Sequence, residues 1–131
     1  KDITLGGCME ELIHFKNVKK TYQIGEKKYN ALDSVSFTIN KGEFVVILGP
    51  SGAGKSTLLN LLGGMDKATS GTIQVGNEII SNYSDKELTS YRSENVGFIF
   101  QFYNILPTLT VLENVELVSE IVKKPKNAKK I

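Results

Sequence analysis

A glycine-rich segment near the middle of the chain carries the residue types that bind phosphate. It matches the pattern GxxxxGK[ST] at every fixed position. Glycines let the backbone curl its N–H groups around phosphate oxygens, and a following helix adds its positive N-terminal dipole. We expect Lys55 to face solvent and reach the outer phosphates, and Ser56 to offer its hydroxyl to Mg²⁺. The predicted nucleotide-binding residues are Gly49, Pro50, Ser51, Gly52, Ala53, Gly54, Lys55, Ser56 and Thr57.

The elements on either side of this segment must hold it in place. The apolar run at residues 44–48 directly precedes it, and its continuous hydrophobicity predicts a buried strand in a sheet that is covered on both faces. The apolar run at residues 58–62 directly follows and predicts a helix that starts at Lys55 and stops at Gly63 and Gly64. A strand, a glycine-rich turn and a helix in this order are the usual support of a phosphate-binding loop.

The rest of the chain alternates strand and helix signals. Ser84 with Glu87, and Thr110 with Glu113, form capping boxes that predict helices reaching to about Tyr91 and about Lys123. Gly76 and Asn77 separate two short apolar segments and predict a type II′ hairpin turn. The predicted strands are residues 12–22, 35–39, 72–75, 78–80 and 96–100, with a loop tip at residues 25–28 and a turn at residues 40–42.

Composition limits the classes to which the chain can belong. Its 131 residues suit one domain, 40% of them are hydrophobic, and no apolar run approaches the length of a membrane span. A single cysteine, Cys8, can form no intrachain disulfide and predicts a cytosolic protein with a free thiol. The net charge of +2 includes five lysines within residues 123–131, and this tail has no aromatic residue. We therefore expect no nucleic-acid partner.

Three separated motifs together resemble a known family. Tyr22, the segment at residues 49–57, and Gln101 with the following residues 106–115 (LPTLTVLENV) occur in the order seen in the ATP-binding subunit of ATP-binding-cassette (ABC) transporters. The chain is most similar to the branch that serves lipoprotein release, macrolide export and antimicrobial-peptide resistance. The resemblance covers residues 9–131, and residues 1–8 are interpreted as a leader or added residues.

The resemblance implies a fold and a set of roles. The fold would be α/β, a P-loop NTPase of the ABC ATPase type with an N-terminal antiparallel β-subdomain and an incomplete core. Tyr22 would stack on adenine, while Lys55 and Gln101 would be catalytic. Ser56 and Gln101 would bind Mg²⁺, and ATP would be the nucleotide. The partners would be a second nucleotide-binding subunit and a transmembrane permease subunit, and the protein would be cytoplasmic and peripheral on the inner face of the cell membrane.

The surface expected to meet the permease is residues 102–112, from Phe102 to Leu112. Phe102, Tyr103, Ile105, Leu106 and Leu109 make this segment too apolar for an idle loop. The alternative, that it folds back on its own core, stays open. His14, the only histidine, is expected to be an ordinary surface residue of its strand.

Several family parts do not occur in these 131 residues. There is no LSGGQ-like signature, no second apolar strand ending in Asp-Glu and no switch histidine. We therefore interpret the chain as the N-terminal portion of a longer subunit that binds nucleotide but does not hydrolyse it alone. In the family, the missing acidic strand lies between the strands that end at Leu48 and Gln101. We expect the chain to pair a wrong strand in this gap, to stay partly disordered, or to borrow a strand from a second copy. The borrowed strand is the outcome we favour.

Two other interpretations remain. A small P-loop GTPase or kinase is one, because residues 40–43 (NKGE) superficially resemble a guanine-reading NKxD motif. Glu43 replaces its Asp, however, and the motif precedes the phosphate loop. The other is a non-enzymatic remnant that acts by occupying the permease through residues 102–112.

Overall fold

The protein is described by a computed structural model covering residues 10–102 and 104–121. The chain forms two compact units, the first ending at Ser84 and the second beginning at Asp85. The predictions that concern Cys8, residues 1–9, Tyr103 and the lysine-rich tail lie outside the described residues.

A membrane-spanning helix is not among the described helices, since none of them is both long and apolar enough.

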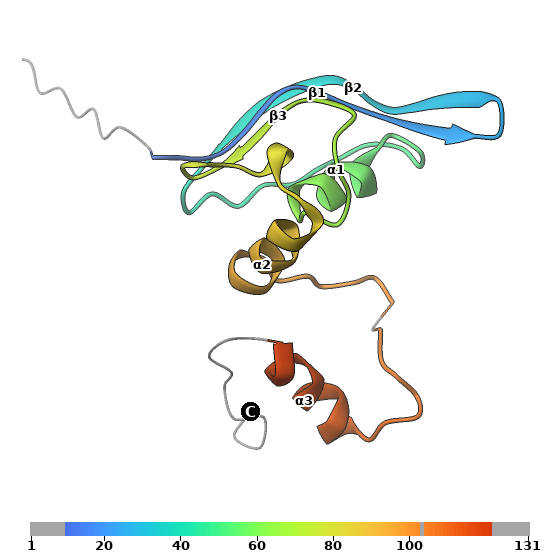
Figure 1. Ribbon diagram of the computed structural model, residues 1–131, viewed down its shortest axis with the longest axis vertical. Helices are drawn as coiled ribbons and strands as arrows, with labels where there is room; N and C mark the ends of the chain where they lie inside the picture. The colour runs from blue at the N-terminus through green and yellow to red at the C-terminus, as the bar shows by residue number, and fades with distance from the viewer. Residues whose placement is uncertain (1–9, 103, 122–131) are drawn as a thin grey trace, which may run out of the picture. The chain divides into compact units, whose positions relative to one another are not determined.

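The first unit is built on a four-stranded antiparallel sheet (Figure 1). The strands are β1 (Glu11–Ile24), β2 (Lys27–Asn40), β3 (Ser70–Val75) and β4 (Glu78–Ile79), and their order in the sheet is β2-β1-β3-β4. β1 and β2 form a long hairpin in which Tyr22 lies opposite Tyr29. The prediction of strands at residues 12–22 and 35–39 is confirmed, but β2 is much longer, so the expected loop tip shrinks to Gly25 and Glu26.

An irregularity in β1 shapes the core of the first unit. Phe15 and Val18 are both completely buried, although residues three apart on a regular strand point to opposite faces. The pairing register shifts between them, and Asn17 adopts a φ of +50°. Gly71 of β3 fits against this irregularity, since an added Cβ would lie 2.3 Å from the Asn17 carbonyl oxygen. The bulge therefore lets both apolar side chains enter the core.

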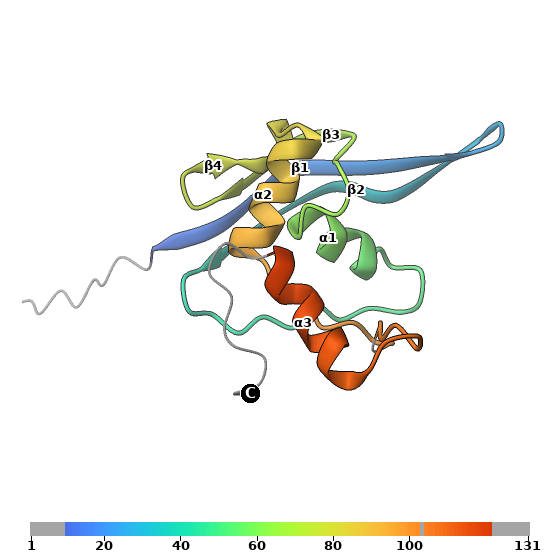
Figure 2. The ribbon, with the colours of Figure 1, turned by 60° about the horizontal axis from the view of Figure 1, so that its bottom comes forward.

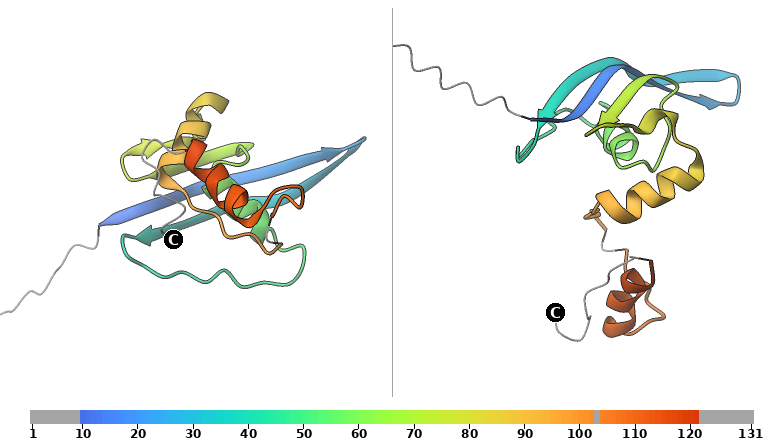
Figure 3. Two further views of the ribbon diagram at one scale, coloured as in Figure 1. Left: turned by 90° about the horizontal axis from the view of Figure 1, so that it is seen from below. Right: turned by 60° about the vertical axis from the view of Figure 1, so that its left-hand side comes forward.

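Helix α1 (Lys55–Leu62) lies against one face of the sheet (Figures 1 and 3). It begins at Lys55 and ends before Gly63, as predicted. Gly64 has a φ of +67°, its N–H donates to Leu61, and the Met65 N–H donates to Asn60 at 2.8 Å. These bonds are those of a Schellman cap, which needs a residue with positive φ and so favours glycine. Leu61 is almost fully buried and anchors α1 in the core.

The hairpin between β3 and β4 has the predicted two-residue turn (Figure 2). Gly76 has a φ of +57°, whereas Asn77 is not among the residues with positive φ. Positive φ at only the first turn residue is the property of a type II′ turn. The chain continues through the short 3-10 helix η1 (Ile80–Asn82), which buries Ile80.

The turn after β2 is also as predicted. Gly42 has a φ of +80°, and the Asn40 N–H donates to the Glu43 carboxylate at 2.7 Å. Hydrogen bonds from the backbone and side chain of Asn40 lower the pKa of Glu43. Glu43 is therefore used to close this turn.

The structure corrects the prediction of a buried strand at residues 44–48. These residues form no strand, and Phe44 is 93% and Leu48 87% exposed. A strand needs a neighbour to receive its N–H and C=O groups. The sheet formed by the described residues places no strand beside this run. The apolar sequence alone therefore does not make it a strand.

The second unit contains α2 (Asp85–Asn95) and α3 (Val111–Ile121). Both helices start where the sequence predicts, although α2 runs four residues beyond Tyr91. At the start of α3, the Thr110 N–H donates to the Glu113 carboxylate at 2.7 Å, and the Glu113 N–H donates back to the Thr110 hydroxyl at 3.3 Å. This reciprocal pair is the predicted capping box.

A second correction concerns residues 96–100, which were predicted to be a strand. They are irregular in the structure, and Ile99 is fully exposed. The physical reason is the same as for residues 44–48, since no described strand pairs with this run. The stacked rings of Phe98 and Phe100, 5.5 Å apart, are a local contact between alternate residues.

Candidate phosphate-binding site

The predicted phosphate loop, residues 49–54, leads directly into α1. Gly52 and Gly54 have φ values of +82° and +83°, a backbone conformation that residues with a Cβ rarely adopt. Gly54 is the N-cap of α1, and no side chain caps the helix there. An anion bound at this end would receive the free N–H groups and the positive end of the helix dipole. The loop geometry therefore suits phosphate.

The loop packs closely against strand β2. A Cβ added to Gly54 would lie 2.4 Å from the Ala31 carbonyl oxygen and 2.9 Å from the side chain of Leu32. A Cβ added to Gly52, in contrast, would meet nothing within 4 Å. Gly54 is therefore required both by its backbone conformation and by close packing, whereas Gly52 is required by conformation alone.

Lys55 is held by its own loop. Its ammonium donates to the carbonyl oxygens of Gly49 at 2.8 Å and Pro50 at 2.7 Å. The side chain is half-buried. The ammonium stays exposed, as expected of a solvent-facing lysine, but it is bonded to the loop carbonyls and not free in solvent. Because both bonds are exposed, a phosphate group could replace these carbonyls as partners of the ammonium.

Tyr29 is a loop contact that the sequence analysis missed. Its hydroxyl donates to the Gly52 carbonyl oxygen at 3.1 Å. A tyrosine in a strand gives no local sign of such a role, and the loop lies 23 residues further along the chain. The only available signal is the hairpin register, which places Tyr29 opposite Tyr22 and therefore on the same face of the sheet.

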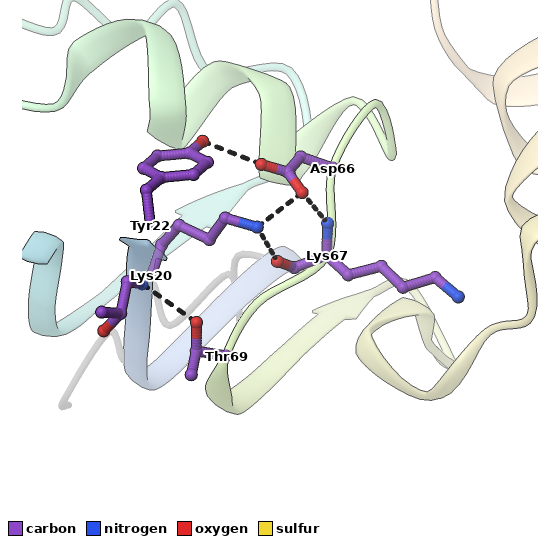
Figure 4. A network of polar contacts seen from close by, with 6 residues as sticks. Lys20, Tyr22, Asp66, Lys67 and Thr69 are labelled. Carbon is purple, nitrogen blue, oxygen red and sulfur yellow. Dashed lines mark hydrogen bonds and ion pairs between the residues drawn. The ribbon is translucent and has the colours of Figure 1, made fainter. Parts of the chain in front are cut away.

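Tyr22, the predicted adenine partner, belongs to a polar network (Figure 4). Its hydroxyl donates to the Asp66 carboxylate at 2.8 Å, and the Lys20 ammonium donates to the same carboxylate at 2.6 Å. Lys20 also donates to the Lys67 carbonyl oxygen at 2.8 Å, and its nitrogen lies 4.8 Å from the centroid of the Tyr22 ring. The network ties β1 to the segment that follows α1.

The network changes the pKa values of its members. Burial raises the pKa of Tyr22, and the hydrogen bond to Asp66 adds to the increase, while a hydrogen bond with Thr57 opposes it. Burial alone would raise the pKa of Asp66, but hydrogen bonds from Lys20, Tyr22 and the Lys67 N–H outweigh it and leave the pKa below its usual value. Asp66 is thus the anion of the network and Tyr22 its neutral donor. Stacking of Tyr22 on adenine remains a prediction.

The remaining predicted residues of the site divide between the two units. Ser51, Ala53 and Ser56 are exposed on the loop and the first turn of α1. Gln101 is exposed in the second unit, directly after the irregular run at residues 96–100. Within the first unit, the structure joins the loop residues to Tyr22 through a hydrogen bond between Thr57 and Tyr22. Among the described residues, no group of three His, Cys, Asp or Glu side chains is placed to hold a metal ion.

Asn114 organises the apolar segment that follows Gln101. Its side chain accepts the Leu106 N–H at 2.8 Å and donates to the carbonyl oxygens of Leu106, Leu109 and Thr110. Phe102 is 77% and Ile105 62% exposed, while Leu109 is half-buried. The segment is therefore a loop fixed by α3 that presents apolar side chains on its surface.

Comparison with known proteins identifies the family. A protein family described as ABC transporter matches residues 32–131. The chain is 45% identical over 109 residues to the macrolide export ATP-binding/permease protein MacB of Shigella flexneri, covering 83% of this chain and 17% of that protein. It is 41% identical over 106 residues to the lipoprotein-releasing system ATP-binding protein LolD of Alcanivorax borkumensis, covering 81% of this chain and 46% of the relative.

A solved structure agrees with these relatives. An ATP-binding cassette of Methanocaldococcus jannaschii, described as a dimer in a post-hydrolysis state bound to ADP and Pi, is similar with a TM-score of 0.81 and 43% identity. The similarity covers 91% of this chain and 52% of that one. The chain spans about half the length of the curated relatives that it matches first, between 45% and 47%. With the glycine-rich loop, α1 and the antiparallel sheet already described, these matches show that the chain belongs to the ABC transporter family, as part of its ATP-binding domain.

Proposed function

We propose that this chain binds ATP with Mg²⁺ through residues 49–57, as part of the ATP-binding subunit of an ABC transporter that exports its substrate. The observation that carries the proposal is the loop itself. Two glycines with positive φ and a helix N-terminus without a side-chain cap offer N–H groups to the phosphates. The exposed Lys55 ammonium contacts the carbonyl groups of the same loop. A bound triphosphate would take Lys55 from the Gly49 and Pro50 carbonyls, and this exchange favours an anion of high charge.

The roles of the other site residues follow from their chemistry. Ser56 would bind Mg²⁺ through its hydroxyl and Gln101 through its amide oxygen, and hard oxygen donors of this kind suit that ion. Bound Mg²⁺ would neutralise phosphate charge. Tyr22 would stack on the adenine ring, with its hydroxyl held by Asp66.

We propose that hydrolysis and transport require more than these residues. Phosphoryl transfer to water needs an oriented nucleophile and neutralised charge in the transition state, and binding of the ground state alone does not accelerate chemistry. The 131-residue chain has no LSGGQ-like signature and no Asp-Glu strand. We therefore expect the isolated chain to bind ATP without sustained release of phosphate.

The partners are proposed from the exposed segment of the second unit and from the relatives. Residues 102–112 present Phe102 and Ile105 on their surface, and this favours docking to a permease subunit at the inner face of the membrane. The alternative function, a non-enzymatic remnant that occupies the permease, would use the same segment. A second ATP-binding subunit is proposed because the similar M. jannaschii cassette is a dimer. The GTPase or kinase alternative loses its support, because Asn40 and Glu43 close a turn with each other.

The test is a binding titration with Mg-ATP, Mg-GTP and Mg-tripolyphosphate. We expect saturable binding of ATP and tripolyphosphate by the wild-type chain and at least a tenfold loss for both in Lys55→Ala, because a charge-assisted contact to phosphate is removed. Lys86→Ala, at an exposed lysine of α2, is the matched control and should bind as the wild type does. Unchanged affinity of Lys55→Ala would reject the assignment, and preference for GTP would favour the other enzyme class.

A further inference from the structure

Two tyrosines lie opposite each other on the β1–β2 hairpin but have different partners. Tyr22 of β1 bonds through its hydroxyl to Asp66, beyond the C-terminal end of α1. Tyr29 of β2 bonds through its hydroxyl to the Gly52 carbonyl oxygen, within the phosphate loop. One hairpin position therefore faces the proposed base site, and the other faces the proposed phosphate site.

The Tyr29 contact holds one side of a peptide unit that no side-chain packing restrains. Gly52 has a φ of +82° and no neighbour within 4 Å of an added Cβ, so side-chain packing does not hold it. Because a peptide bond is planar and trans, holding the Gly52 carbonyl also fixes the direction of the Ala53 N–H. That N–H donates to the Pro50 carbonyl oxygen at 3.2 Å. The tyrosine thus acts on the same turn that Lys55 holds from inside the loop.

The importance of Tyr29 should grow when a ligand binds. In the ligand-free loop, Lys55 bonds to the Gly49 and Pro50 carbonyls and helps to close the turn. A triphosphate that attracts the ammonium removes this support. Tyr29 donates from a different element, β2, and its bond does not depend on Lys55. It can hold the loop in both situations, which lowers the ordering cost of binding.

We propose that Tyr29 is a positioning residue of the phosphate site, which holds the Gly52 carbonyl and so keeps the loop in a shape ready for a triphosphate. This inference rests on the proposed function of the loop. Tyr29 should therefore affect the affinity for any ligand that carries a triphosphate, whether or not the ligand has a base. Tyr22, in contrast, is assigned to ligands that carry adenine.

The experiment compares Tyr29→Phe with the wild type. Tyr83→Phe is the matched control, because it also removes one phenol hydroxyl, from a tyrosine to which no role in the loop is assigned. Mg-ATP and Mg-tripolyphosphate are titrated into each. Loss of one neutral hydrogen bond to a half-exposed phenol should weaken both ligands by the same factor, about two- to fivefold. Tyr83→Phe should bind both as the wild type does.

Amide hydrogen exchange of the ligand-free proteins supplies a readout that does not depend on binding. In Tyr29→Phe we expect faster exchange at residues 52–54, with unchanged exchange at residues 13–15 of β1, whereas general destabilisation would accelerate both. Unchanged loop exchange together with unchanged affinity would overturn the inference, and so would a loss confined to ATP. Failure of the wild type to bind either ligand would refute the proposed function, while loop exchange would still decide whether Tyr29 holds the loop.

Discussion

The phosphate loop and the apolar run that precedes it are adjacent in sequence but differ in how they are held. Residues 49–64 keep a defined shape through bonds made within the segment and through contacts with β2. Residues 44–48 form no strand and leave Phe44 and Leu48 exposed. The loop is specified locally by glycines, a lysine and a helix cap, whereas a strand also needs a neighbour. The binding loop can therefore form even though the run that precedes it does not form a strand.

The largest expected effect concerns the two loop glycines. Gly54→Ala should abolish measurable tripolyphosphate binding and destabilise the first unit by more than about 2 kcal/mol, because the left-handed conformation alone costs about 1 to 2 kcal/mol and a clash with the Ala31 carbonyl is added. Gly52→Ala lacks the clash and should cost only about 1 to 2 kcal/mol. Urea unfolding and a tripolyphosphate titration measure both changes. Equal effects of the two substitutions would contradict the packing of the loop against β2.

The second prediction concerns the exposed apolar runs. We expect the chain to self-associate at micromolar concentration, because residues 44–48 and 96–100 offer exposed apolar side chains to a second copy and pair with no strand of the described sheet. Val46→Asp should weaken association at least tenfold, while Lys86→Asp, which introduces an acid at an exposed position of α2, should not. Light scattering over a concentration series gives the measurement. A stable, cooperatively folding monomer would count against a borrowed strand.

These two regions also mark what the sequence could predict. The start of α1 at Lys55, its glycine cap, the Gly76–Asn77 turn and the Thr110–Glu113 capping box were predicted, because each depends on residues within a few positions. Residues 44–48 and 96–100 were mispredicted, because their hydrophobicity suits a strand but does not provide the partner strand.

The contacts around the site were missed for a related reason. Lys20 and Asp66 are 46 residues apart, and Tyr29 lies 23 residues from Gly52. Such pairs follow from the way β1, β2 and α1 pack together and have no local signature. The attachment of Lys55 to the Gly49 and Pro50 carbonyls was missed as well, because it depends on the three-dimensional course of the loop.

The network of Lys20, Tyr22 and Asp66 should make the free energy of unfolding depend on pH, and this effect is smaller than those above. The pKa of Asp66 is lowered in the folded chain, so its contribution is complete above its unfolded pKa of about 3.9 and is lost as the pH falls through the folded pKa. Asp66→Asn should therefore lower the free energy of unfolding by about 1 kcal/mol at neutral pH and have little effect in acid. Urea denaturation at several pH values tests this. The same difference at pH 7 and in acid would mean that the carboxylate charge contributes nothing.

The pKa of Tyr22 shifts in the opposite direction and gives a check at high pH. Because the folded-state pKa is raised, the contribution of the hydroxyl is complete below the unfolded pKa of about 10 and is lost as the pH rises through the folded pKa. Absorbance titration of the phenol should report an ionisation at higher pH than that of a free tyrosine, and Asp66→Asn should move it part of the way back, because burial remains. An ordinary Tyr22 titration in the wild type would show that the network is not formed.

The smallest effect is expected at Asn114, which holds a loop of the second unit by local bonds. Asn114→Ala removes its bonds to Leu106, Leu109 and Thr110, and should accelerate amide exchange at residues 106 and 108–110 severalfold. The exchange of α2 should not change. If the loop exchanged as before, it would be held by contacts other than the asparagine.

Residues 52–57 are proposed to hold a triphosphate although the preceding run is not a strand. Amide resonances followed during a titration with Mg-tripolyphosphate test this most directly. We expect saturable shifts at residues 52–57, arising from the N–H groups of the loop and the first turn of α1, with resonances of residues 13–15 of β1 unchanged. The absence of saturable shifts at residues 52–57, or their confinement to other residues, would contradict the claim.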